Sequence, residues 1–263
     1  MIENIELPKT DKNVLLALSG GLDSTVLLHL LVNTYGVDKV KTVSFDFGQR
    51  HDIELEMAIK SAKRLGVDHR IIKLDYLGQI SKGNSSLIKD SIAKPKTYEE
   101  NAGDPQIDTY VPFRNLQFAA IEAAYAEAND CRYIFQGLNC IDIYGYWDTS
   151  FDFVEAVNAV LRMNRHHVIE FKAPFVELYK EDELILAKEL SGIFGFDVLA
   201  YTWSCYNGAN ETGKECGLVG QCNTCIEKLT GYIKAGYSND EIMKKFQVGS
   251  ESNLILFRKS IEE

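Results

Sequence analysis

A glycine-rich string with a hydroxyl group at each end, Ser19-Gly20-Gly21-Leu22-Asp23-Ser24, has the composition of a phosphate-binding turn. Glycine lets a backbone turn sharply and approach a ligand closely, and the free N–H groups at the start of a helix attract an anion. Ser19 and Ser24 can add hydroxyl donors, while Asp23 can cap the helix or hold Mg²⁺, which prefers carboxylate and phosphate oxygens. The string has neither the G-x-x-x-x-G-K-[ST] nor the G-x-G-x-x-G spacing, so it predicts a phosphate site of another kind.

Four cysteines gather near the end of the chain: Cys205, Cys216, Cys222 and Cys225. The last two form a C-x-x-C turn, and glycines in the same stretch let the chain fold around an ion. Thiolates at such spacing favour tetrahedral Zn²⁺ in a closed, structural site. An iron–sulfur cluster, a redox-active pair and four free thiols are the alternatives.

The elements that position these groups alternate between strand and helix along the chain. An apolar run at residues 14–18 directly precedes the glycine-rich string, and helical spacing directly follows it. Further strands are predicted at 40–45, 69–74, 132–135 and 168–171, and helices at 24–33, 52–65, 115–128, 151–163 and 180–190. This alternation predicts an α/β fold, a Rossmann-like parallel sheet with helices on both faces. We expect a main domain at residues 1–200 and a small C-terminal zinc-binding region with a helical tail at 201–263.

The charge and composition of the chain limit the classes of partner that it can be expected to bind. The net charge is −10 at pH 7, and the isoelectric point is about 5.1. A long nucleic-acid footprint needs a basic face, so DNA or tRNA is disfavoured. The polar N-terminus does not resemble a signal peptide, and no apolar stretch reaches the ~18 residues that predict a membrane span. We expect a cytoplasmic protein with reduced cysteines and no membrane contact.

The glycine-rich string resembles the S-G-G-x-D-S signature of the PP-loop ATP pyrophosphatases, which have a HUP-type fold. Together with the cysteines and further strings, the chain resembles the 7-cyano-7-deazaguanine synthase family over about residues 12 to 237. The further strings are FDFGQRH at 45–51, residues 83–87, YVPFRN at 110–115, QGLN at 136–139 and TWSCY at 202–206.

The resemblance implies a reaction that consumes ATP and releases AMP and pyrophosphate. ATP would adenylate the carboxylate of 7-carboxy-7-deazaguanine, ammonia would displace AMP to give the amide, and a second ATP would activate the amide oxygen for dehydration to the nitrile. The implied cofactors are ATP, Mg²⁺ and Zn²⁺. The implied partners are a small deazapurine and ammonia, and the resemblance also suggests a homodimer.

Residue roles follow from the same resemblance. Asp23, Arg114 and Lys180 would be catalytic, with the two cations neutralising phosphate charge; for Arg114 a surface ion pair and for Lys180 a solvated helix start are the alternatives. ATP would meet Ser19, Gly20, Gly21, Asp23, Ser24 and Phe45. The deazapurine would meet Gln49, Arg50, His51, Asn139, Asp142 and Tyr146, and the metal would meet the four clustered cysteines.

The chain departs from the family pattern at two places. The family string G-Y-P-D-C-R-P-E-F is GYWDTSFDF at residues 145–153, and the spacing from Cys216 to Cys222 is three residues longer. An alternative function is therefore transfer of the activated acyl group to another amine, on a protein or a nucleic acid. The sequence also leaves open a tRNA-modifying PP-loop enzyme, a nucleotide-binding regulatory module without turnover, and an amidotransferase fed with ammonia by a partner.

Overall fold

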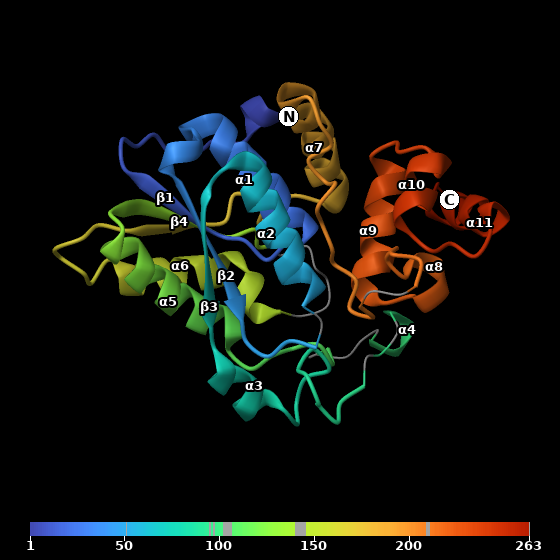
Figure 1. The fold of residues 1–263 in the computed structure, drawn as a ribbon, viewed down its shortest axis with the longest axis horizontal. Helices are drawn as coiled ribbons and strands as arrows, with labels where there is room; N and C mark the ends of the chain where they lie inside the picture. The colour runs from blue at the N-terminus through green and yellow to red at the C-terminus, as the bar shows by residue number, and fades with distance from the viewer. Residues whose placement is uncertain are drawn as a thin grey trace.

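The computed structural model describes residues 1–50, 52–94, 96, 98–101, 107–139, 146–208 and 211–262. Its centre is a five-stranded sheet in the order β3-β2-β1-β4-β5, with every neighbouring pair parallel (Figure 1). The strands are β1 Asn13–Ala17, β2 Val40–Asp46, β3 Asp68–Lys73, β4 Cys131–Phe135 and β5 Glu170–Lys172. The predicted parallel sheet is confirmed.

The carboxyl ends of β1 and β4 lie at the point where the order of the strands reverses. From β1 the chain builds outward through β2 to β3, then crosses back and adds β4 on the other side of β1. Ligands of open parallel sheets bind at this point, beyond the carboxyl ends of the strands. The glycine-rich string follows β1 directly, so the topology alone delivers it to that place.

Two hydrophobic cores cover the two faces of the sheet. Val14 and Leu16 of β1 belong to one core and Leu15 to the other, because successive side chains of a strand point to opposite faces. Burial on both faces explains why β1 is continuously apolar. The helices on the first face are α1 Leu22–Tyr35, α2 Ile53–Leu65 and α7 Lys180–Phe194, and those on the second are α5 Arg114–Ala128 and α6 Phe151–Leu161.

The polar stretch at 75–108 contains α3 Asp75–Ser81 and α4 Tyr98–Asn101. Helix α3 forms because Leu77 and Ser81 are buried one turn apart. Single 3₁₀ turns lie at Ile2–Asn4, Val37–Lys39 and Trp147–Thr149.

The C-terminal part of the chain packs beside α7 (Figure 1). We call residues 203–262 the cysteine lobe; it contains α8 Gly217–Gly220, α9 Asn223–Lys234, α10 Asn239–Lys245 and α11 Glu251–Glu262. Leu229 and Ile233 of α9 share a core with α1 and α7, so the lobe is anchored on the sheet domain. The boundary at residue 200 stays a prediction.

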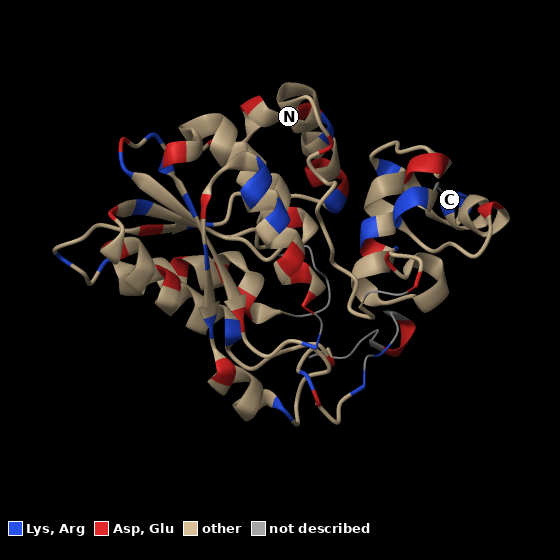
Figure 2. Ribbon diagram, viewed as in Figure 1, with Lys and Arg blue, Asp and Glu red and all other residues tan. Residues whose placement is uncertain are grey.

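Charged residues of both signs are interspersed over the helices and loops (Figure 2). Within the described ranges, no helix combines the length and apolar character needed to cross a membrane.

Candidate active site

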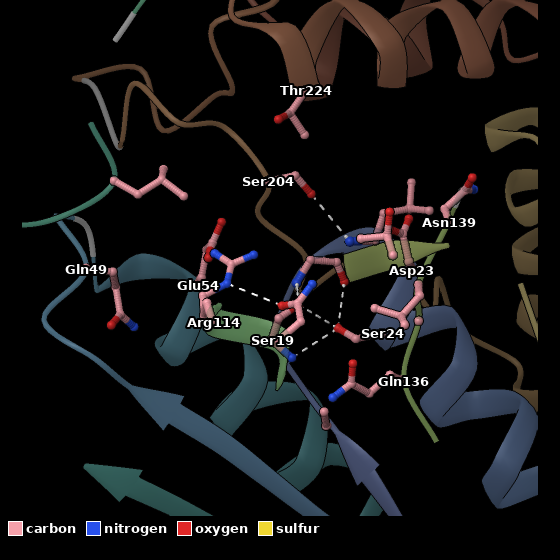
Figure 3. A pocket seen from close by; sticks show the side chains of 18 of the residues that line it. Ser19, Asp23, Ser24, Gln49, Glu54, Arg114, Gln136, Asn139, Ser204 and Thr224 are labelled. Carbon is pink, nitrogen blue, oxygen red and sulfur yellow. Dashed lines mark hydrogen bonds between the residues drawn. The ribbon is translucent and has the colours of Figure 1, made fainter. Parts of the chain in front are cut away.

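A cavity of about 310 Å³ opens at the carboxyl ends of β1, β2 and β4. Its floor is the string Ser19–Ser24, here called the phosphate loop, and the cysteine lobe forms the opposite wall (Figure 3). The cavity therefore lies where the strand order reverses, and where the sequence predicts the site.

Glycine is required at the turn of the phosphate loop. Gly20 has φ +88°, and a Cβ there would lie 2.0 Å from the carbonyl oxygen of Glu54. The hydroxyls of Ser19 and Ser24 hydrogen-bond at 2.9 Å, and the Gly21 N–H donates to Ser19 Oγ at 3.2 Å. Helix α1 begins directly after this turn without a side-chain cap, and the positive end of a helix dipole attracts an anion.

The predicted phosphate residues Ser19, Gly21, Asp23 and Ser24 all line the cavity. Gly20 lies behind them against α2. Gly137, after β4, packs closely against the end of the phosphate loop, since a Cβ there would lie 3.0 Å from the Ser24 nitrogen.

Lys180 joins the phosphate loop from far along the chain. Its Nζ lies 2.8 Å from Asp23 Oδ1 and 3.6 Å from Glu183 Oε1, and its side chain is 10% exposed. The solvated alternative is therefore wrong. Burial raises the pKa of Asp23, but the Lys180 ammonium and neighbouring hydrogen bonds outweigh it, and the pKa is lowered overall. Burial and the Asp23 charge hold the pKa of Glu183 well above its usual range. The arrangement is a lysine beside two carboxyl groups, of which Asp23 has a lowered and Glu183 a raised pKa.

Arg114, the first residue of α5, lines the cavity next to Glu54 (Figure 3). The guanidinium lies 5.6 Å from the Phe47 ring centroid and 5.8 Å from that of Phe118, so aromatic faces support it. Burial raises the pKa of Glu54 to about 7, although the Arg114 charge opposes this. Phe45, assigned to ATP, also lines the cavity, stacked on Phe118 at 4.1 Å.

The residues assigned to the deazapurine fall into two groups. Gln49, Arg50, Asn139 and Tyr146 line the cavity, whereas His51 and Asp142 lie outside the described residues. Gln49 folds back on its own loop: Oε1 accepts from the Phe47 N–H at 2.9 Å. Asn139 Nδ2 donates to Glu183 Oε1 at 2.9 Å and Arg50 Nη2 donates to the Ala93 carbonyl at 3.1 Å. These bonds fix the three side chains in the wall.

Four aromatic residues, Tyr110, Phe113, Tyr146 and Trp147, hold the loop before α5 against the segment after β4. We call them the aromatic clasp. The Tyr110 hydroxyl accepts from the Phe113 N–H at 3.1 Å and from Trp147 Nε1 at 3.0 Å. The rings of Phe113 and Trp147 meet edge to face at 5.3 Å. Trp147 stands where the family string G-Y-P-D-C-R-P-E-F has its first proline, so part of the clasp is built where the chain departs from that string.

Phe113 takes a left-handed backbone conformation, with φ +53°. Bulky residues adopt it rarely, at a cost of about 1 kcal/mol or more. Because Arg114 follows directly as the first residue of α5, this turn sets where the guanidinium enters the cavity.

The four predicted metal ligands come together. The sulfur atoms of Cys205, Cys216, Cys222 and Cys225 all lie within 4.8 Å of one another, and the side chains are buried. A tetrahedral site with Zn–S bonds of about 2.3 Å has sulfurs about 3.8 Å apart, so the cluster fits such an ion. Cys205 also lines the cavity, so the metal site adjoins the candidate active site.

The cysteine lobe supplies cavity residues that the sequence did not single out. They are Ser204, Tyr206, Asn223, Thr224, Glu227 and Lys228, together with Glu54 from α2. A usable signal was the helical spacing after Cys222, since Thr224 and Lys228 are one turn apart and share a face.

Comparisons with known proteins agree with this geometry. The family model described as "Queuosine biosynthesis protein QueC" matches residues 13–236. A protein of Chromobacterium violaceum is 31% identical over 242 residues, covering 92% of this chain and 97% of its own. One of Caldicellulosiruptor saccharolyticus is 35% identical over 219 residues, covering 83% and 90%. One of Pseudomonas aeruginosa is 37% identical over 236 residues, covering 87% and 96%. All three are named 7-cyano-7-deazaguanine synthase, and nothing among them favours the alternative functions.

Proposed function

The chain belongs to the queuosine biosynthesis protein QueC family, and on that premise we propose that it is an ATP-dependent carbon–nitrogen ligase that makes 7-cyano-7-deazaguanine from the 7-carboxy acid and ammonia. One observation carries the proposal: the phosphate loop, the Lys180–Asp23 pair and Arg114 meet in one cavity. These groups together can support the transfer of an adenylyl group to a substrate oxygen.

The chemistry requires two activations. In the first, a carboxylate oxygen bonds to the α-phosphorus of ATP and pyrophosphate leaves. Ammonia then adds to the acyl carbon, and AMP leaves with the electron pair of the C–O bond, giving the amide. In the second, the amide oxygen is adenylated in the same way; loss of the two N–H protons and of AMP forms the C≡N bond.

The phosphate loop would stabilise the charge that grows on each pyrophosphate. Backbone N–H groups at the start of α1 and the hydroxyls of Ser19 and Ser24 are donors that need no reorganisation. Lys180 and Arg114 would neutralise phosphate charge from opposite sides. Asp23 would hold Mg²⁺, whose charge the triphosphate requires.

The other end of the cavity would hold the deazapurine. Phe45 would contact ATP, while Gln49, Arg50, Asn139 and Tyr146 would form the base pocket. His51 and Asp142 remain proposed base contacts from the family resemblance. The metal of the cysteine cluster would be Zn²⁺, which supplies structural cross-linking of the lobe. A homodimer and a cytoplasmic location remain predictions.

The test uses the purified chain with ATP, Mg²⁺, 7-carboxy-7-deazaguanine and ammonium, followed by mass spectrometry. We expect two AMP and one nitrile per acid consumed. AMP with an acid adenylate or amide, and no nitrile, would place the chain in a different acyl-transfer reaction. Absence of AMP with this acid would overturn the substrate.

A further inference from the structure

A buried lysine in the cavity wall has no role in the proposed reaction so far. Lys228 lines the cavity, although its side chain is only 2% exposed. It lies on α9 three residues after Cys225, so it belongs to the cysteine lobe. An ammonium group taken out of water needs partners that offset the lost hydration.

Helix α9 brings Lys228 toward the phosphate loop. Thr224, Lys228 and Gly231 follow the i, i+4, i+7 spacing of one helix face. Gly231 packs directly on α7, since a Cβ there would lie 2.8 Å from the Cβ of Lys180. The same face therefore delivers Lys228 to the region that Lys180 occupies. Burial raises the pKa of Asp23, whereas the charges of Lys180 and, to a lesser extent, Lys228 lower it, so both ammonium groups act on the loop.

Ser204 connects Lys228 to the loop. Its Oγ lies 3.3 Å from Lys228 Nζ and accepts a hydrogen bond from the Leu22 N–H at 3.4 Å. Leu22 is the first residue of α1. The Lys228 ammonium is thus one side chain away from the N–H groups assigned to pyrophosphate.

An ion pair with Glu215 accounts for part of this environment. Lys228 Nζ lies 2.9 Å from Glu215 Oε1, and the glutamate side chain is 1% exposed. Desolvation offsets most of the attraction in such a buried pair, so the pair is weak as a stabilising element. An ammonium has three donors, and Glu215 and Ser204 take two of them among the described residues. The third can meet a ligand in the cavity.

We propose that Lys228 is a further catalytic residue, whose ammonium contacts the pyrophosphate alongside Lys180. This rests on the proposed function. When the substrate oxygen bonds to the α-phosphorus, the bond to the bridging oxygen breaks and its electron pair stays on the pyrophosphate. A fixed cation at that place stabilises the charge as it develops. The cysteine cluster then orients a catalytic helix, because Cys222 and Cys225 hold its first turn.

The test compares Glu215→Gln with the double variant Lys228→Met/Glu215→Gln, which removes both charges and leaves none buried alone. Calorimetry measures the Kd of magnesium pyrophosphate, and a coupled assay measures pyrophosphate release. For the double variant we expect pyrophosphate Kd to rise at least tenfold and release to slow about 100-fold. For Glu215→Gln we expect the Kd to fall, because Lys228 loses a competing carboxylate. Lys228→Arg should keep most of the activity.

Thermal unfolding and metal content per chain confirm that each variant folds and loads its metal. A folded double variant with unchanged pyrophosphate Kd would overturn the role of Lys228, as would weaker binding by both variants to the same extent. The calorimetry does not use the deazapurine acid. An acid that yields no AMP with the wild-type chain would therefore overturn the proposed function and leave the test of Lys228 in force.

Discussion

The two ends of the cavity are built differently. At the phosphate end, backbone packs on backbone: Gly20 touches the carbonyl of Glu54, and Gly137 touches the start of α1. At the opposite end, Tyr146 lines the cavity, and the other side chains of the aromatic clasp lie outside the lining and hold one another, with Phe113 55% and Trp147 44% exposed. At the phosphate end there is no space for a larger side chain at either glycine, whereas the opposite end is held by a few contacts between side chains. If the proposed function holds, the ATP-binding end is fixed by backbone packing, while the fit of the deazapurine depends on side chains that can be exchanged.

The largest effect should come from filling the space at Gly20. In Gly20→Ala, the new Cβ would collide with the Glu54 carbonyl 2.0 Å away, in a backbone conformation that alanine disfavours. We expect a loss of more than about 3 kcal/mol in unfolding free energy, measured by urea denaturation, and no pyrophosphate release.

The matched control is Gly36→Ala. Gly36 has a similar φ of +85°, but nothing lies within 4 Å of its added Cβ. It should lose about 1 to 3 kcal/mol from backbone strain, less than Gly20→Ala, and keep its activity. Equal losses in the two variants would show that strain, and not backbone packing, is what restricts the phosphate end.

Removing a cation from the phosphate end should affect rate more than stability. In Lys180→Met the charge that faces Asp23 is lost, and we expect pyrophosphate release to slow about 100-fold. Lys188→Met, on the exposed side of the same helix, is the control and should be within about twofold of wild type. A rate in Lys180→Met close to that of its control would remove this residue from the chemistry.

Glu54 lies between the two ends and should give the protein a pH dependence. Its pKa is about 7 in the folded chain, raised mainly by burial, against a usual 4.5. Ionisation is harder in the folded state, so its contribution to stability is complete below pH 4.5 and is lost as the pH rises through 7. Relative to wild type, Glu54→Gln should therefore gain about 2 kcal/mol of unfolding free energy between pH 5 and pH 8. If the urea midpoints of Glu54→Gln and wild type differ by the same amount at both pH values, the raised pKa is contradicted.

The smallest effect should follow from loosening the aromatic clasp. Trp147→Phe removes the Nε1 donor to Tyr110 and keeps an aromatic ring, which costs about 1 kcal/mol. We expect the KM for the deazapurine acid to rise several-fold with the Kd of pyrophosphate unchanged. Phe151→Leu, at an exposed neighbouring position, should change neither quantity. An equal change in the KM for the acid and in the Kd of pyrophosphate would show that the two ends of the cavity are not independent.

Local patterns in the sequence were enough to predict the sheet, the phosphate loop and the cysteine cluster. Each strand, the phosphate loop and the cysteine cluster are formed by residues close together in the chain: the loop lies between a buried strand and a helix, and the cysteines share one stretch. Glu54 and Lys228 escaped prediction because each looks like a solvated helix residue until tertiary packing buries it. The partner of Lys180 was equally hidden, since it lies 157 residues away. The backbone conformation of Phe113 could not be predicted either, because phenylalanine rarely adopts a left-handed conformation.

The long separations within the site also set when it can exist during synthesis. Leu22 and Ser204 bond across 182 residues, and Lys228 comes later still. At about 5–20 residues per second, the ribosome needs about 10 to 40 s to go from the phosphate loop to that lysine. During this interval the nascent chain carries the loop without its opposite wall. ATP therefore encounters a complete site only after Lys228 has been synthesised, and a chain terminated before that residue lacks the opposite wall of the cavity.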